Sequence, residues 1–288
     1  MRIFLHSFFN SAFMVHHSAI PTLRKVAEDG FVVVESPSSF VCDTKGVAHT
    51  NEGVGNIFDN FDKESIAVIP LRGIMTKYNS WNIGTDTVAS WIRQANESDN
   101  ISGIIIQGDT PGGAVSSLFG ISDAISESSK PIYMFVDYML CSCGYYIGSF
   151  CDKIFAINDY CEIGSIGVMA TVFRKNKNAM DNYLYYPEDV YPPESPDKNI
   201  EIRNSENGDD TLLIEDVLTP LANNFREVVQ KNRPQLDITA DGVITGKTFF
   251  AKDALKVGLI DGIASFDTVV KELKENIATK QTIINTFK

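Results

Sequence analysis

Short apolar runs that alternate with helical patterns constrain the fold of this 288-residue chain more than any other feature. Such runs occupy residues 66–71, 101–106 and 131–136, and each has the length and composition of a buried strand. Between the first two, residues 85–97 place apolar side chains at helical spacing. Strands that alternate with helices predict an α/β layer fold.

The second apolar run ends in a glycine-rich turn, Thr110-Pro-Gly-Gly113. Gly112 and Gly113 allow backbone N–H groups to approach a ligand with no side chain in the way, and a helical stretch follows them. Such a turn suits an oxyanion or a phosphate. A plain tight turn is the alternative for an isolated Pro-Gly-Gly.

The third apolar run leads to a serine. Residues 138–146 read Tyr-Met-Leu-Cys-Ser-Cys-Gly-Tyr-Tyr, which places Ser142 between a strand and the start of a helix. A glycine-flanked turn at residues 161–169 exposes Ser165 in a similar way. Functional groups gather at the carboxyl ends of strands in open α/β sheets, so the pattern predicts that Ser142 is a nucleophile.

A serine nucleophile needs a base, either a histidine or a lysine whose pKa is lowered by burial. All four histidines lie at position 49 or earlier, so a Ser-His-Asp triad requires the N-terminal segment to fold back; they are His6, His16, His17 and His49. Lysine is the more economical hypothesis. Lys198 lies in the Pro-rich residues 183–210, which we expect to form an irregular flap over the site. A solvated lysine is the alternative.

The motifs between residues 65 and 262 together resemble the signal peptide peptidase A family and the related phage prohead or capsid-maturation proteases. Thr110-Pro-Gly-Gly113 corresponds to the family's Ser-Pro-Gly-Gly, and Cys141-Ser-Cys-Gly-Tyr-Tyr146 to its Ala-Ser-Gly-Gly-Tyr-Tyr. The family's Gly-Ser-Ile-Gly-Val occurs unchanged at residues 164–168. The resemblance implies a Clp protease/crotonase-like fold of repeated ββα units wound into a superhelix.

The resemblance also implies roles for individual residues. Ser142 would be the nucleophile, Ser165 the hydroxyl that orients the base, and Lys198, which is 198 − 142 = 56 residues beyond the serine, the base. Backbone N–H groups of Gly112 or Gly113 and of Cys143 would form the oxyanion hole. Cys143 replaces a glycine, so its side chain is expected to narrow or shield the cleft. Neither Cys141 nor Cys143 has an evident activating base, so we discount a cysteine nucleophile.

Composition limits the partners. A formal charge of −12 and a pI near 4.8 argue against nucleic-acid binding, which needs clustered lysine and arginine. No histidine lies among the clustered cysteines, so we expect no metal and no cofactor. The odd number of cysteines favours a reducing, cytoplasmic compartment, and no stretch of about 18 apolar residues predicts a membrane span.

We divide the chain into an N-terminal segment of unassigned role, a propeptide or an extension, at residues 1–62, a serine peptidase domain at 63–265 and a C-terminal helix at 266–288. The absence of a membrane anchor favours the phage branch. The expected function is therefore a Ser-Lys endopeptidase that cleaves scaffold or capsid protein during phage head maturation, in the host cytoplasm or the assembling virion. The family assembles into rings, so we expect a homo-oligomer, with residues 212–229 as a candidate interface or, equally, as core packing.

Four alternatives stay open at this point. A cellular peptidase that degrades signal peptides is the alternative within the same family. A Clp proteolytic subunit would need a histidine base, and an acyl-CoA hydratase would need no serine nucleophile, so the motifs disfavour both. A catalytically silent capsid-assembly or scaffold component would keep the fold alone.

Overall fold

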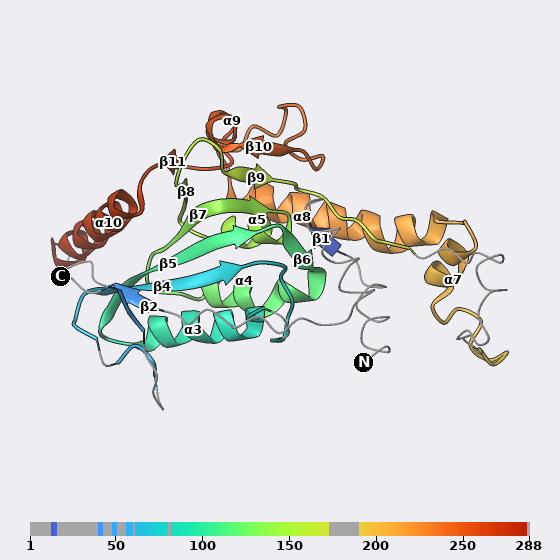
Figure 1. Cartoon of the computed structure of the whole chain (residues 1–288), viewed down its shortest axis with the longest axis horizontal. Coiled ribbons are helices and arrows are strands. Elements are labelled where there is room, and N and C mark those ends of the chain that lie inside the picture. The colour runs from blue at the N-terminus through green and yellow to red at the C-terminus, as the bar shows by residue number, and fades with distance from the viewer. Residues whose placement is uncertain are drawn as a thin grey trace.

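The computed structural model describes residues 13–15, 40–42, 48–50, 56–59, 61–79, 82–172 and 190–286 (Figure 1). Its strands are β1 (Phe13–Val15), β2 (Phe40–Cys42), β3 (Ala48–Thr50), β4 (Ser65–Arg72), β5 (Ile101–Thr110), β6 (Gly112–Ala114), β7 (Ile132–Cys141), β8 (Lys153–Ala156), β9 (Glu162–Gly164), β10 (Thr248–Phe250) and β11 (Gly262–Ile263). Its helices are α3 (Thr85–Glu97), the short 3-10 turn η2 (Val115–Ser117), α4 (Phe119–Ser126), α5 (Cys143–Gly148), α7 (Ile200–Glu206), the π-helical η3 (Leu213–Leu218), α8 (Thr219–Asn232), α9 (Ala251–Lys256) and α10 (Phe266–Thr286).

A parallel group of strands forms the centre of the main sheet, whose order is β10-β9-β7-β5-β4-β2-β3. β4 pairs with β5 and β5 with β7, all parallel, and β2 and β10 add antiparallel partners toward the two edges. β4 is buried from Ser65 to Leu71, as expected for a continuous apolar run covered on both faces. The predicted α/β class and its alternating strands and helices are therefore confirmed.

Helices cover both faces of this sheet. α3, α4 and α5 bury Val88, Ile121 and Ile147 against one face, and α10 packs Val269 and Leu273 against the other. In Figure 1, α3 and α4 run alongside the strands, and α10 lies near the end of the sheet where β5 begins. Among the described helices, none is both long and apolar enough to cross a membrane.

β7 changes partner along its length. Its first half, Tyr133 to Val136, pairs with β8, whereas Met139 to Cys141 pairs with β9. The end of β7 is thus separated from β8 and is held instead by β9 and by Thr110 of β5. This change of partner places Ser142, the next residue, beside the turn that follows β9.

Three sequence expectations need correction or extension. Residues 183–210 were expected to be irregular, but Ile200–Glu206 form α7; residues 183–189 lie outside the described part. The helix expected at 212–229 consists of π-helical η3 followed by α8, with Pro220 in the first turn of α8. The N-terminal segment also contributes strands, because β2 pairs with β4, and β1 with β6.

Candidate active site

Ser142 lies at a sharp turn between β7 and α5. Its backbone has φ 55° and ψ −119°, a conformation that is uncommon for a residue with a side chain. Its N–H donates to the Gly164 carbonyl at 2.8 Å, its Oγ lies 3.4 Å from the Gly167 carbonyl oxygen, and the residue is 1% exposed. Strained residues held by their surroundings cluster at functional sites, so the geometry supports the predicted strand-to-helix nucleophile.

The two tyrosines after Ser142 fix α5 in place. The buried Tyr145 hydroxyl donates to the Leu259 carbonyl at 2.8 Å, and burial raises the pKa of this phenol, which keeps it a donor. The Tyr146 ring contacts Phe225 of α8 at a centroid distance of 5.4 Å. Between Ser142 and these tyrosines, a Cβ on Gly144 would come within 2.4 Å of Thr110 Cγ2. Glycine at 144 therefore allows α5 to approach the end of β5.

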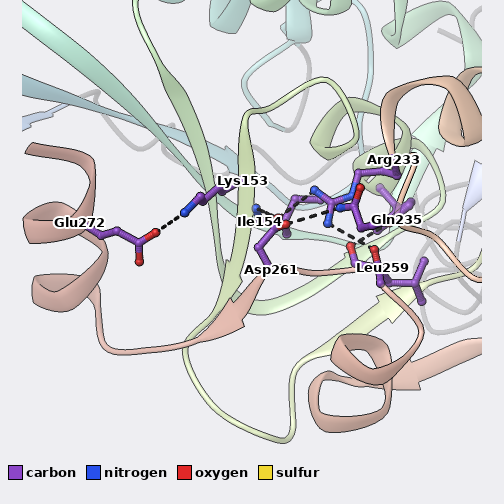
Figure 2. A network of polar contacts seen from close by, with 9 residues as sticks. Lys153, Ile154, Arg233, Gln235, Leu259, Asp261 and Glu272 are labelled. Carbon is purple, nitrogen blue, oxygen red and sulfur yellow. Dashed lines mark hydrogen bonds and ion pairs between the residues drawn. The ribbon is translucent and has the colours of Figure 1, made fainter. Parts of the chain in front are cut away.

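A buried ion pair supports the same helix from behind. Arg233, 2% exposed, bonds through Nη1 to Asp261 Oδ2 at 2.8 Å and through Nη2 to the Gly258 carbonyl at 3.3 Å. The same Asp261 oxygen accepts the Ile154 N–H at 2.7 Å, which joins the end of α8 to β8. Figure 2 shows this group beside Leu259, the residue whose carbonyl accepts the Tyr145 hydroxyl. The network thus links α8, β8 and the loop before β11 to the helix that follows Ser142.

The glycine turn is held close to α5 as the short strand β6. Met75 donates its N–H to the Gly112 carbonyl at 2.9 Å, and its carbonyl accepts the Ala114 N–H at 3.0 Å. A Cβ on Gly113 would lie 2.0 Å from the Met75 carbonyl oxygen, so only glycine permits this approach. The Gly112 N–H already donates to Thr110 Oγ1 at 3.0 Å. Of the two predicted oxyanion donors on this turn, the geometry therefore favours Gly113.

Both cysteines beside Ser142 point into the protein interior. Cys143 is fully buried, with Sγ 3.4 Å from the Gly113 carbonyl oxygen and 3.6 Å from that of Ala114. The expectation that this side chain narrows the cleft is wrong, because the thiol packs against the backbone of β6. Burial raises the pKa of the Cys141 thiol well above its ordinary range, so this residue is a poor nucleophile.

Ser165 lies in the turn that contacts Ser142. It has φ 54° and follows Gly164, whose carbonyl accepts the Ser142 N–H. The Ser165 N–H donates to the Lys247 carbonyl at 2.9 Å, which fixes the turn to the segment before β10. The structure therefore brings the predicted orienting residue to the nucleophile turn.

Lys198, in contrast, is not brought to Ser142 within one chain. It is exposed and lies two residues before α7, and the residue between them, Asn199, has a left-handed conformation. Figure 1 shows α7 beyond the far end of α8, away from α5. A sequence separation of 56 residues carried no information on this distance in space.

The histidines divide into two groups. His49 lies on β3, at the edge of the main sheet opposite β10, and is therefore remote from Ser142. His16 and His17 directly follow β1, which does fold back onto β6, but both histidines lie outside the described residues, as does His6. A histidine base requires the N-terminal segment to fold back, and among the described N-terminal strands β1 does so by pairing with β6.

Sequence reasoning passed over Lys247, the lysine nearest the Ser165 turn in the hydrogen-bond network. Its carbonyl holds Ser165, while its side chain is 54% exposed, with Nζ 3.4 Å from Asp241. Its position before β10 becomes visible only when β10 is paired with β9. In the described part of the chain, no group of three or more histidine, cysteine or acidic residues is placed to bind a metal ion.

The region around Ser142 is similar in sequence to known peptidases. A sequence model for "Peptidase family S49" matches residues 124–182, which contain β7, Ser142, α5 and the Ser165 turn. A "Protease 4" of Haemophilus influenzae is 25% identical over 232 residues, covering 75% of this chain and 35% of that protein. A "Putative signal peptide peptidase SppA" of Enterococcus faecium is 24% identical, covering 72% of this chain and 59% of that protein.

Phage proteins match as well. "Capsid assembly protease C" of Escherichia phage lambda is 30% identical over 112 residues, covering 36% of this chain and 25% of that protein. The solved structure of a mutant of the "1510-N membrane-bound stomatin-specific protease" aligns with a TM-score of 0.48 at 20% identity, covering 73% of this chain and 85% of that one. The chain thus spans only part of the length of the curated proteins it matches, about a third of protease 4. Residues 124–182 thus match peptidase family S49, and the chain is similar to bacterial signal peptide peptidases and to a phage capsid assembly protease.

Proposed function

We propose that this protein is a serine endopeptidase in which Ser142 is the nucleophile and Lys198 the base. The observation that carries the proposal is the strained, buried Ser142 at the start of α5, inside the segment that matches peptidase family S49. Fixed groups around it, from the Gly164 carbonyl to the tyrosines of α5, hold its backbone before any substrate arrives.

The proposed reaction is acyl transfer. Ser142 Oγ gives its proton to neutral Lys198 and attacks the carbonyl carbon of the scissile peptide bond. Backbone N–H groups of Gly113 and Cys143 stabilise the oxyanion that forms. The lysine then donates its proton to the leaving amine, and water hydrolyses the acyl-enzyme by the same steps in reverse. Ser165 would orient the lysine amine.

The position of Lys198 adds a requirement to this mechanism. Because Lys198 is exposed and separated from α5 by the length of α8, it reaches Ser142 only if its segment moves or if a second copy supplies it. We propose a homo-oligomer in which such a contact is made. The exposed Ile214 on η3 supports residues 212–229 as a contact surface, since burial of an apolar side chain against a second copy is favourable.

The substrate we propose is a polypeptide, in particular scaffold or capsid protein during phage head maturation. The relative named capsid assembly protease C supports this choice, and the site would then work in the host cytoplasm or assembling virion. The signal peptide peptidase relative supports the other candidate, degradation of signal peptides in a bacterial cell. A test with both substrate types, a scaffold protein and a free signal peptide, separates the two.

The experiment for the activity compares wild type, Ser142→Ala, Lys198→Ala and Lys247→Ala on unfolded casein, followed by mass spectrometry of the products. We expect Ser142→Ala to lose cleavage by about 10³-fold or more. Lys198→Ala should lose about 10²- to 10⁴-fold, whereas Lys247→Ala, the matched lysine near the Ser165 turn, should retain activity. Cleavage that persists in Ser142→Ala refutes the nucleophile, and no cleavage by wild type favours a silent assembly component.

A mixing experiment tests how the base reaches the serine. Ser142→Ala and Lys198→Ala proteins are combined, dissociated and allowed to reassemble before assay. If the base comes from a second copy, mixed assemblies contain intact sites and cleavage returns. A mixture that stays inactive, while reassembled wild type is active, assigns both residues to one chain. His16→Ala and His17→Ala should leave cleavage unchanged, and loss in either would replace the lysine with a histidine.

A further inference from the structure

The strand that carries the predicted oxyanion donor has two edges, and each is occupied. On one edge, Met75 bonds to the Gly112 carbonyl and to the Ala114 N–H. Since N–H and carbonyl groups alternate along a strand, this pattern turns the Gly113 N–H away from Met75, toward the second edge. The second edge pairs with β1, in the antiparallel register Phe13↔Ala114, Met14↔Gly113 and Val15↔Gly112.

This pairing places the N-terminal strand where an incoming polypeptide would bind. An extended peptide that presents its carbonyl to the Gly113 N–H must run along the second edge of β6, because the first edge is closed by Met75. Addition of an extended peptide to an open strand edge is a common mode of peptide recognition. The register of β1 sets Met14 opposite Gly113, so β1 uses the same backbone groups.

We propose that β1 is an internal ligand of the substrate-binding edge, and that it blocks this edge of β6 until it is displaced or removed. The inference rests on the proposed function, since it treats β6 as the strand that receives the substrate. A tethered segment competes at a high effective concentration, so a free peptide of similar sequence binds poorly while β1 is in place.

The pairing also explains why β6 needs a partner in the resting protein. Gly112, Gly113 and Ala114 are all buried, and a buried N–H without an acceptor costs free energy. β1 supplies main-chain acceptors to this edge without a covalent bond, so a substrate strand can replace it with little change in hydrogen bonding. The N-terminal segment therefore stabilises the site and occupies it at the same time.

A binding experiment on the full chain tests the proposal without requiring catalysis. All proteins carry Ser142→Ala, and the probe is a fluorescein-labelled peptide of residues 11–18, followed by anisotropy. Met14→Pro removes one N–H from β1 and opposes strand pairing, while the matched Met14→Ala keeps that N–H. We expect the peptide to bind Met14→Pro about tenfold or more tightly than Met14→Ala. Equal binding, with both proteins folded by circular dichroism, refutes the proposal.

A disulfide between β1 and β6 would fix β1 in place, whereas Met14→Pro releases it, and this test uses protein that keeps Ser142. If Met14 and Gly113 form the hydrogen-bonded pair, Phe13 and Ala114 form a non-hydrogen-bonded pair with a Cα separation of about 4.5 Å, within the range of a disulfide. Oxidised Phe13→Cys/Ala114→Cys should cleave casein at least about tenfold more slowly than the same protein after reduction, with Ala114→Cys alone as control. Equal rates with the disulfide confirmed by mass spectrometry refute the block. If peptide binds as expected but no protein cleaves casein, the proposed activity fails and the internal ligand stands.

Discussion

Ser142 and Lys198, the two residues of the proposed dyad, are held in opposite ways. Ser142 is 1% exposed, has a strained backbone and is tied to the Gly164 turn, to β5 through Gly144 and to the C-terminal loops through Tyr145. Lys198 lies exposed in a turn before the seven-residue α7. One chain therefore holds the proposed nucleophile and the proposed oxyanion donor in place, whereas the proposed base is exposed.

The residues around Ser142 are buried and packed, whereas Lys198 is exposed, and a sequence motif does not distinguish these two cases. Substitutions on the Ser142 side should reduce stability as well as activity, because those residues are buried in a packed network. A substitution at Lys198 should change activity and leave the free energy of unfolding within about 0.5 kcal/mol, as for other exposed positions.

Arg233→Ala should cause the largest loss of stability. It leaves Asp261 and the Gly258 carbonyl without the buried guanidinium, and because the Asp261 side chain is 24% exposed, the cost should be about 3 kcal/mol, the lower end for a broken buried ion pair. Urea unfolding followed by tryptophan fluorescence measures the change, with Lys231→Ala, an exposed position in the last turn of α8, as control. Equal free energies of unfolding for the two variants would show that the contacts of Arg233 with Asp261 and Gly258 do not stabilise the protein.

Gly113→Ala should separate β6 from Met75. The added Cβ meets the Met75 carbonyl oxygen at 2.0 Å, so the backbone must shift, at a cost of about 1–3 kcal/mol. Displacement of the Gly113 N–H should also lower kcat by about 10²- to 10³-fold, as for the loss of an oxyanion donor. Gly120→Ala, where the added Cβ would meet only Asp86 Oδ1 at 3.4 Å, controls for the loss of a glycine. A fully active Gly113→Ala protein contradicts the assignment of this donor.

Cys143→Ala should destabilise the protein modestly and leave cleavage intact. The thiol packs on the Gly113 and Ala114 carbonyls, so its removal leaves a small void that costs about 1 kcal/mol. The Cys143 backbone N–H remains, and kcat/KM should stay within about threefold of wild type. Faster hydrolysis of large substrates by Cys143→Ala would instead indicate a side chain that shields the cleft.

Asp109→Asn should raise stability slightly at pH 7, a small effect at the end of β5. Burial first, and the nearby Asp137 second, raise the pKa of the Asp109 carboxyl, so its ionised form is disfavoured in the folded protein. We expect a Tm increase of about 1–3 °C at pH 7, which shrinks as pH falls through the raised pKa and disappears below the ordinary value of 3.8. The exposed Asp159→Asn is the control, and an increase that persists at pH 3 contradicts this cause.

The sequence was sufficient for the central strands, for α3 and for Ser142 at the start of a helix, because apolar periodicity and turn residues act locally. It could not show the direction of the Cys143 side chain, since that depends on how closely β6 approaches α5. It could not show that β1 pairs with β6, or that α7, which begins two residues after Lys198, lies away from α5. Each of these features depends on contacts between distant segments, which no local pattern encodes.

The most direct test of the central claim is the rate at which a peptidyl fluorophosphonate modifies Ser142, followed by intact mass and peptide mapping. Wild type should gain one adduct, located on Ser142. The reaction rate of Lys198→Ala should be at least about a hundredfold lower than that of wild type, while Lys247→Ala should react at the wild-type rate. An adduct on another residue, or equal rates in wild type and Lys198→Ala, would contradict a dyad of Ser142 and Lys198.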